Sequence, residues 1–146
     1  MAPRREGPPA AGALQGKQGV CFAFLLKGEA GCSRGDGCRF RHLTPEDPDA
    51  RALRVGDGRG CISQRGLTDA VTAAPKELMM RFVDAWGGQM HDRAIGNIWN
   101  KLGQQLRDDR GRDAWVVEHG EVLARLRRRS VEVLPEWRMP EWLGKV

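Results

Sequence analysis

The sequence predicts a small, irregular N-terminal module followed by a mainly α-helical region. Three of the four cysteines and one of the three histidines fall within residues 21–42 of the 146-residue chain. From about Leu67 onward, apolar residues recur at the three- to four-residue spacing of amphipathic helices. All five tryptophans lie beyond residue 85, whereas three of the four phenylalanines lie before residue 41, so the two parts differ in aromatic content.

Composition favours an intracellular protein with an anionic partner. The formal net charge is +5, the pI is about 9.4 and the mean hydropathy is −0.52, a balance that suits polyanions such as nucleic acid. No apolar run approaches the ~18 residues of a membrane-spanning helix, and the N-terminus lacks the apolar core of a secretory signal. We therefore expect reduced cysteines and a nuclear or cytoplasmic location, while the Arg-bearing start leaves an organelle open.

The chain divides into five segments by composition. Its first residues are rich in Pro, Gly and Ala without periodicity, which is typical of a disordered leader. Prolines, glycines and charges are frequent again after the Cys/His cluster, which suits a linker. In order, we expect a disordered leader at 1–16, a Cys/His module at 17–42, a linker at 43–65, a helical domain at 66–130 and a Trp- and Pro-containing tail at 131–146.

The helical region begins with a strong amphipathic pattern. In "PKELMMRFVDAW" the side chains of Leu78, Phe82 and Trp86 recur at i, i+4 and i+8, which places them on one helical face. Pro75 suits the first turn of this helix, and the Gly-Gly pair that follows Trp86 can end it. The pattern therefore predicts one helix between these limits.

Two further helices are predicted after it. The second begins with Asp92 as its N-cap and runs to Leu106, and the third runs from Asp113 to Leu126. Because the loops between the helices are short, we expect antiparallel packing in a small three-helix bundle. Its core is expected to contain three large aromatic side chains: Phe82, Trp86 and Trp99.

The Cys/His cluster has the spacing of a metal site. Ten residues separate Cys21 from Cys32, five separate Cys32 from Cys38, and three separate Cys38 from His42. Three thiolates and one imidazole can close a tetrahedral site around one structural Zn²⁺, with no position left open for catalysis. A segment this short has too few apolar residues for a core of its own, so metal binding would supply the missing folding free energy. The alternatives are a chance cluster or a disulfide.

At these residues the chain resembles the CCCH zinc finger family, over about residues 19–42. The C-x5-C-x3-H half and the surrounding "KGEAGCSRGDGCRFRH" carry the resemblance, although the ten-residue first gap is longer than is common in the family. We expect "LLKGEAG" to bulge in order to accommodate it. The resemblance implies a finger that binds single-stranded RNA, with Phe24 and Phe40 at the family's base-stacking positions and Arg34 where many members have an aromatic residue.

The residues around the cluster favour an RNA interface on physical grounds as well. Aromatic faces stack on bases at about 1–3 kcal/mol each, and neighbouring cations attract phosphates. The plane of an Arg guanidinium can also stack on a base. Alternatively, the phenylalanines form a small core over the metal, as we expect for Phe22, and the cations form a solvated face. The expected phosphate contacts are Lys17, Lys27, Arg39 and Arg41.

A second resemblance concerns the helical region. Residues 77–106, and "IGNIWNKLGQQL" in particular, resemble one unit of the helical-repeat RNA-binding proteins of organelles. A stable solenoid usually needs about three or more units. The sequence therefore favours the three-helix bundle over a helical-repeat fragment.

The remaining features do not point to catalysis. His91 and His119 are far apart in the sequence, and neither has the neighbouring pattern of a metal ligand or a general base. Cys61 lies outside the finger spacing and is expected to be a linker or packing residue. The basic run "RLRRRS" could contact phosphate, act as a nuclear localisation signal or end a helix favourably.

We therefore predict a non-enzymatic protein that binds one structural Zn²⁺ and single-stranded RNA, without membrane association. The helical domain is expected to add affinity or to recruit a protein partner. The alternative is an interaction module of a larger assembly, in which the finger and the two PEW tripeptides of the tail, at 135–137 and 140–142, dock on protein.

Overall fold

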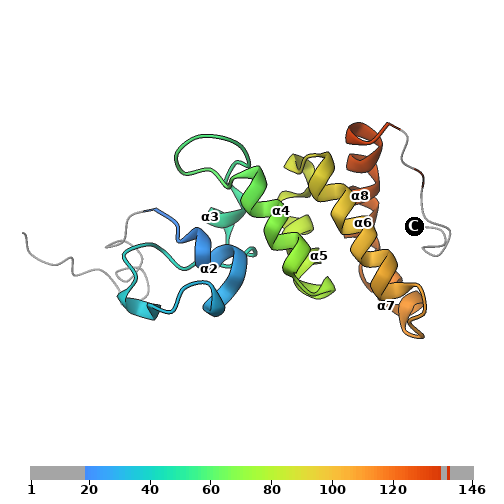
Figure 1. Ribbon diagram of the computed structural model, residues 1–146, viewed down its shortest axis with the longest axis horizontal. Helices are drawn as coiled ribbons and strands as arrows, with labels where there is room; N and C mark the ends of the chain where they lie inside the picture. The colour runs from blue at the N-terminus through green and yellow to red at the C-terminus, as the bar shows by residue number, and fades with distance from the viewer. Residues whose placement is uncertain (1–18, 136–137, 139–146) are drawn as a thin grey trace, which may run out of the picture.

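The computed structural model describes residues 19–135 and 138, and this part of the chain is mainly helical. Figure 1 shows an elongated molecule with residues 19–42, the described part of the finger, at one end and the last helices at the other. The α-helices are α2 (Phe22–Lys27), α3 (Pro48–Arg51), α4 (Gln64–Ala73), α5 (Lys76–Trp86), α6 (Asp92–Leu106), α7 (Arg112–Glu118) and α8 (Gly120–Val133). Short 3-10 helices lie between them: η1 (Gly28–Ala30), η2 (Gly35–Gly37) and η3 (Gly87–Gln89).

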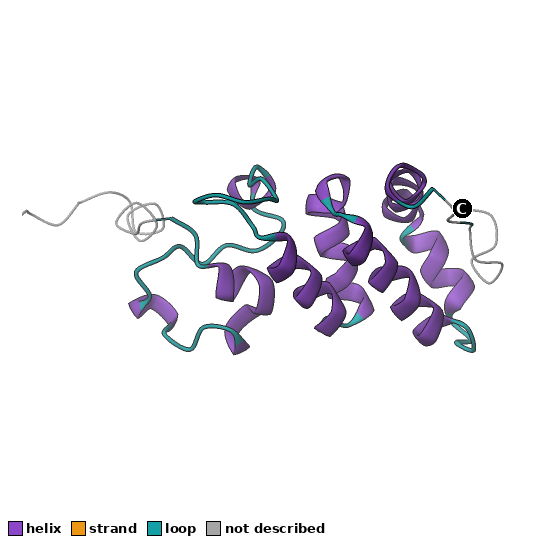
Figure 2. Cartoon of the chain, turned by 45° about the horizontal axis from the view of Figure 1, so that its top comes forward, coloured by secondary structure: helices purple, strands orange, loops and turns teal. Residues whose placement is uncertain are grey.

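Loops connect the helices (Figure 2). The described residues form no sheet, and their strand-like pairing is limited to two isolated bridges. One bridge joins Val20 to Arg41 inside the finger, and the other joins Val55 to Ile62 in the segment that follows. Among the helices that the structure describes, none has the length and apolar character that crossing a bilayer requires.

The first two predicted helices form where the sequence placed them. α5 follows Pro75 and ends at Trp86, and α6 begins at Asp92 itself rather than after it. A further helix, α4, precedes them. Its N-cap Ser63 accepts a hydrogen bond from the backbone N–H of Gly66 at 2.9 Å, which satisfies one of the free N–H groups at the helix start.

The prediction of one continuous third helix is wrong. Residues 113–126 fall in two helices, α7 and α8, which meet at His119. The backbone of His119 has φ −104° and ψ 19°, outside α-helical values, and Gly120 follows it. Glycine costs roughly 1 kcal/mol in a helix interior relative to alanine, so the chain breaks at a weak point of the pattern. With α4 and this division, the helical region is larger than the predicted three-helix bundle.

One hydrophobic core runs through the helices. The aromatic residues predicted for it, Phe82, Trp86 and Trp99, are all buried, and the rings of Phe82 and Trp86 stack with centroids 6.0 Å apart. The indole N–H of Trp99 donates to the hydroxyl of Ser130 on α8 at 2.7 Å, and this hydroxyl donates to the carbonyl oxygen of Leu126 at 2.7 Å. The buried polar atoms of the two side chains are therefore paired.

Residues 43–65, which the sequence suggests as a linker, contribute to the same core. The indole N–H of Trp86 donates to the carbonyl oxygen of Ala50 at 3.0 Å. The side chain of Gln89 accepts from the backbone N–H of Val55 at 2.9 Å. These contacts fix the segment against α5 and η3, and its buried apolar side chains join the core cluster: Leu43, Ala50 and Ile62.

Candidate metal centre

Four side chains of the finger converge on one point. Cys21 lies directly before α2, and Cys32 and Cys38 follow η1 and η2. His42 follows Arg41, which forms the backbone bridge with Val20. Their ligand atoms all lie within 4.8 Å of one another. The four residues are positioned to bind one metal ion, as their spacing in the sequence predicts.

Backbone contacts bring the two ends of the finger together. The N–H of Cys21 donates to the carbonyl oxygen of Arg41 at 2.8 Å, and the N–H of Arg41 donates to the carbonyl oxygen of Gly19 at 2.9 Å. Because His42 directly follows Arg41, this pairing places the first ligand of the sequence beside the last.

The long first gap between ligands is folded into helical turns. α2 and η1 occupy nine of its ten residues, and Gly31 fills the remaining position before Cys32. A helix advances about 1.5 Å per residue, less than half the rise of an extended chain, so the extra residues take up little length. The bulge expected for "LLKGEAG" is therefore wrong.

The four side chains fit a bound metal. Nε2 of His42 is buried and has no hydrogen-bond partner in the described structure, which leaves a nitrogen that a cation would satisfy. All four cysteines of the chain are free thiols, so the cluster is not a disulfide. A tetrahedron with Zn–S bonds of about 2.3 Å has edges of about 3.8 Å. The 4.8 Å limit on the ligand atoms is compatible with such a site after small movements.

The two buried thiols have different electrostatic environments. Burial raises the pKa of Cys21, and the backbone N–H of Phe24 partly offsets this effect. The backbone N–H of Phe40 stabilises the thiolate of Cys38 and lowers the pKa of that thiol to about 7. The thiolate is the form that binds a metal, so both N–H groups favour coordination.

The three phenylalanines of the finger have different surroundings. Phe40 is exposed, with 38% of its surface accessible. Phe24 is half-buried, and its ring stacks on the imidazole of His42 with centroids 4.2 Å apart and planes 7° apart. Phe22 packs against the hydrophobic core that the helices share, and not in a separate small core over the metal. The largest free aromatic surface of the finger therefore belongs to Phe40.

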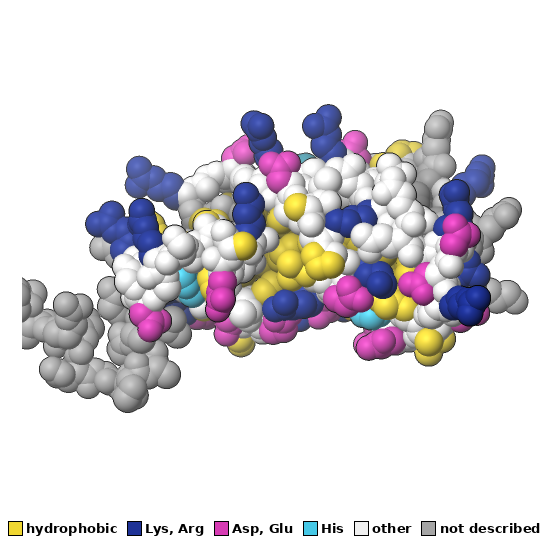
Figure 3. Space-filling view, turned by 60° about the horizontal axis from the view of Figure 1, so that its bottom comes forward, with side chains coloured by type: hydrophobic (Ala, Val, Ile, Leu, Met, Phe, Trp, Pro, Cys, Tyr) yellow, Lys and Arg dark blue, Asp and Glu magenta, His cyan; other side chains and the backbone are white. Residues whose placement is uncertain are grey.

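The cations that were predicted to contact phosphates differ in their exposure and pairing. Lys27, Arg34 and Arg39 are exposed, and Figure 3 shows Lys and Arg side chains gathered at the end of the molecule where the finger lies. Arg41 is half-buried and forms an ion pair with Asp49 at 2.5 Å. Three other residues singled out from the sequence lie outside the described residues: Lys17 and the tail residues Trp137 and Trp142.

Several other sequence features have structural roles. In the basic run of α8, Arg125 pairs with Asp84, and Arg129 pairs with Glu132 at 3.0 Å. The ring of His119 stacks on Trp115, with centroids 4.3 Å apart. Two other candidates differ: the side chain of His91 is exposed, and Cys61 is a half-exposed free thiol.

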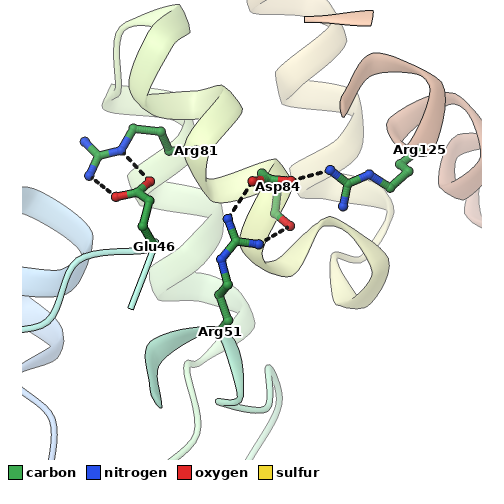
Figure 4. A network of polar contacts seen from close by, with 5 residues as sticks. All are labelled: Glu46, Arg51, Arg81, Asp84 and Arg125. Carbon is green, nitrogen blue, oxygen red and sulfur yellow. Dashed lines mark hydrogen bonds and ion pairs between the residues drawn. The ribbon is translucent and has the colours of Figure 1, made fainter. Parts of the chain in front are cut away.

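Sequence reasoning missed a set of charged contacts that tie residues 43–65 to the helices (Figure 4). Glu46 accepts two hydrogen bonds from Arg81 at 2.6 and 2.8 Å. Asp84 of α5 lies between Arg51, at 2.5 Å, and Arg125 of α8. Arg51 is the larger cause of the lowered pKa of Asp84, and Arg125 adds to it. No signal in the sequence pairs charges more than 30 positions apart.

The chain matches no protein-family model, no curated protein and no solved structure. Neither the finger resemblance nor the helical-repeat resemblance therefore has support from a related protein. The case for the metal centre rests on the convergence of Cys21, Cys32, Cys38 and His42.

Proposed function

We propose that this chain binds one structural Zn²⁺ and uses the surface of its finger to bind single-stranded RNA. The observation that carries the proposal is the placement of the exposed Phe40 between two members of the Cys₃His cluster, Cys38 and His42. Sulfur ligands favour zinc over magnesium or calcium, which prefer oxygen. Four protein ligands complete a tetrahedral shell, so the ion has a structural role.

RNA contact at this surface follows from the chemistry of its exposed side chains. The face of Phe40 can stack on a base whatever its identity, since every base has a π-face. Lys27, Arg34 and Arg39 lie on the same finger and can attract the phosphates. Arg41 is already paired with Asp49 and is a weaker candidate than the other cations.

One hollow on the surface of the helices is lined by amides, a hydroxyl and an amine. This hollow of about 270 Å³ between α4 and α6 is lined by polar side chains. None of these is a carboxylate, a histidine or a cysteine, the groups that most often act as bases or nucleophiles. The lining residues are Thr72, Asn97, Asn100, Lys101, Gln104 and Gln105. The function that we propose, binding of Zn²⁺ and RNA, is non-enzymatic.

A protein-interaction module is the alternative function. The observation in its favour is the exposure of two apolar side chains at the end of the molecule away from the finger, Val117 at 81% and Val131 at 64%. Exposed valines can contribute to a protein interface. This function becomes the better explanation if the zinc-loaded protein does not bind RNA.

The RNA-binding proposal predicts that Phe40→Ala weakens binding of the zinc-loaded protein to a short single-stranded RNA. One lost stack should lower the affinity by about 5- to 150-fold, because base–aromatic stacking contributes roughly 1–3 kcal/mol. Fluorescence anisotropy with a labelled oligonucleotide measures this change. Val117→Ala removes an exposed apolar side chain far from the finger and should leave the affinity unchanged. Equal affinities for the wild type and Phe40→Ala would contradict base stacking.

A further inference from the structure

Three arginines of residues 54–65 are exposed and form no ion pair with another residue that the structure describes: Arg54, Arg59 and Arg65. Within the described chain this sets them apart from Arg51, Arg81 and Arg125, which are paired with carboxylates. Only one acidic residue, Asp57, lies within the same segment. The segment therefore presents a net positive charge that no internal contact uses.

The segment that carries these arginines is a loop with fixed ends. The N–H of Gly56 donates to the carbonyl oxygen of Ile62 at 2.8 Å, and the N–H of Ile62 donates to the carbonyl oxygen of Arg54 at 2.8 Å. Gln89 of η3 accepts from the N–H of Val55, next to this closure. The backbone that carries the side chains is therefore held at the base of the loop.

Two glycines allow the chain to reverse direction within this loop. Gly58 has φ +114° and Gly60 has φ +75°, in the region that residues with a Cβ rarely adopt. Arg59 lies between them, at the turn, while Arg54 lies at one foot of the loop and Arg65 in the first turn of α4. The three guanidinium groups thus come from one turn and its two flanks.

The loop lies at the same end of the molecule as the finger in both Figure 1, where it is green, and Figure 2. A single finger offers only a few stacks and phosphate contacts against an association cost of about 4 kcal/mol or more. Useful affinity therefore requires cations outside the finger. Arginine suits this role because its planar fork can donate two hydrogen bonds to one phosphate.

We propose that residues 54–65, the arginine loop, contact the phosphates of the same single-stranded RNA that the finger binds. This inference rests on the proposed RNA-binding function and extends the interface beyond the finger. The finger stacks on bases, and the arginine loop holds the backbone of the strand. The segment that the sequence suggests as a linker is then part of the RNA-binding surface.

The test compares two triple variants that remove the same three charges. Arg54→Gln/Arg59→Gln/Arg65→Gln removes the cations of the arginine loop. The control, Arg107→Gln/Arg110→Gln/Arg128→Gln, removes three exposed arginines from the α6–α7 loop and α8, at the other end of the molecule. The affinity of each protein for a 20-nucleotide single-stranded RNA is measured by fluorescence anisotropy between 50 and 200 mM salt.

Each phosphate contact to a single strand contributes about 0.7 to the slope of log affinity against log salt. Loss of three contacts should therefore reduce the slope by about 2, so that the wild type loses roughly 18-fold more affinity than the loop variant across this salt range. The control variant should keep a slope close to that of the wild type.

Separate outcomes overturn the two proposals. If Phe40→Ala weakens binding but the loop variant behaves like the control variant, the arginine loop does not contact RNA and the finger proposal stands. If the zinc-loaded wild type does not bind RNA, the proposed function fails and the loop proposal fails with it. A circular dichroism spectrum of each variant shows whether the helices remain folded.

Discussion

At the scale of single residues, Gly31 is the position on which the long first gap of the finger depends. A Cβ at this position would lie 2.2 Å from the carbonyl oxygen of Ala23 and 2.6 Å from the Cβ of Lys27. Real Cβ atoms do not approach backbone oxygen so closely, and the carbonyl belongs to α2 and cannot rotate away. Glycine is therefore required for the chain to pass α2 on its way to Cys32.

We predict that Gly31→Ala destabilises the finger by about 1–3 kcal/mol, the usual cost of forcing an added group into a packed site. The zinc affinity should fall as well, because Cys32 must move with the backbone. Competition with a chromogenic chelator and thermal unfolding measure the two effects. Gly37→Ala is the matched control, since a Cβ at Gly37 meets no atom within 4 Å. Equal behaviour of the two variants would show that the close approach has no energetic importance.

The four candidate metal ligands could be predicted at this scale, but the side chains that contact them could not. Cys32, Cys38 and His42 are close in the sequence, so local turns suffice to bring them together. The stack of Phe24 on His42 joins residues 18 positions apart and depends on where α2 turns its side chains. Spacing alone carries no such information, and for that reason Phe24 and Phe40 look equivalent in the sequence.

At the scale of elements, Asp84 connects three helices through its carboxylate. It belongs to α5 and contacts Arg51 of α3 and Arg125 of α8. Its pKa lies below the ordinary value of 3.8, since both guanidinium groups favour the charged form. A carboxylate with a depressed pKa stabilises the fold above its ordinary pKa, and this contribution disappears as the pH falls through the folded value.

Asp84→Asn should therefore lower the free energy of unfolding at pH 7 by on the order of 1 kcal/mol, the scale of partly exposed ion pairs. The difference from the wild type should shrink as the pH falls below the ordinary pKa of 3.8 and through the lower pKa of the folded state, because the wild-type carboxyl then becomes neutral. Urea unfolding at several pH values measures this. Asp113→Asn, at a side chain that is 95% exposed, should show a smaller difference at pH 7. A constant Asp84→Asn difference at all pH values would contradict the assigned role.

The limits of helix prediction are also visible at this scale. α5 and α6 have continuous apolar stripes and were predicted, whereas the break at His119 divides a stripe that continues on both sides. The apolar pattern records which side chains are buried and does not record where the helix axis changes direction. α3 has only four residues and depends on contacts with α5, so local sequence could not predict it.

At the scale of the whole molecule, the finger and the helices share one hydrophobic core. Leu25 of α2 and Leu43, which follows His42, are 2% and 3% exposed and belong to the same buried cluster as Phe82 of α5. α2 also packs on α4. The composition of the chain suggested two parts joined by a linker. Composition does not show that the parts share a core, because burial of residues so far apart in the sequence depends on tertiary contacts. The stability of the helices should thus depend on the metal centre.

We predict that metal removal lowers the melting temperature of the helical region as well as unfolding the finger. Tryptophan fluorescence reports this selectively, because all five tryptophans lie beyond residue 85. Loss of a ligand that stabilises only the folded state removes several kcal/mol, which for a chain of this size corresponds to roughly 10 °C. Chelation of the wild type and the substitution Cys38→Ser should produce the same shift. Metal analysis should find about one zinc per chain in the untreated wild type and little after chelation or in Cys38→Ser.

Cys61→Ser provides the matched control, since it removes a thiol that does not belong to the cluster. This variant should retain its zinc, and its melting temperature should stay close to that of the wild type. If chelation removes the metal and leaves the tryptophan transition unchanged, the finger folds independently and the shared core contributes little to coupling. If the transition moves with the metal, the packing of Leu25 and Leu43 links the stability of the helices to that of the finger. Replacing either residue with alanine should then reduce the shift in melting temperature that metal removal causes.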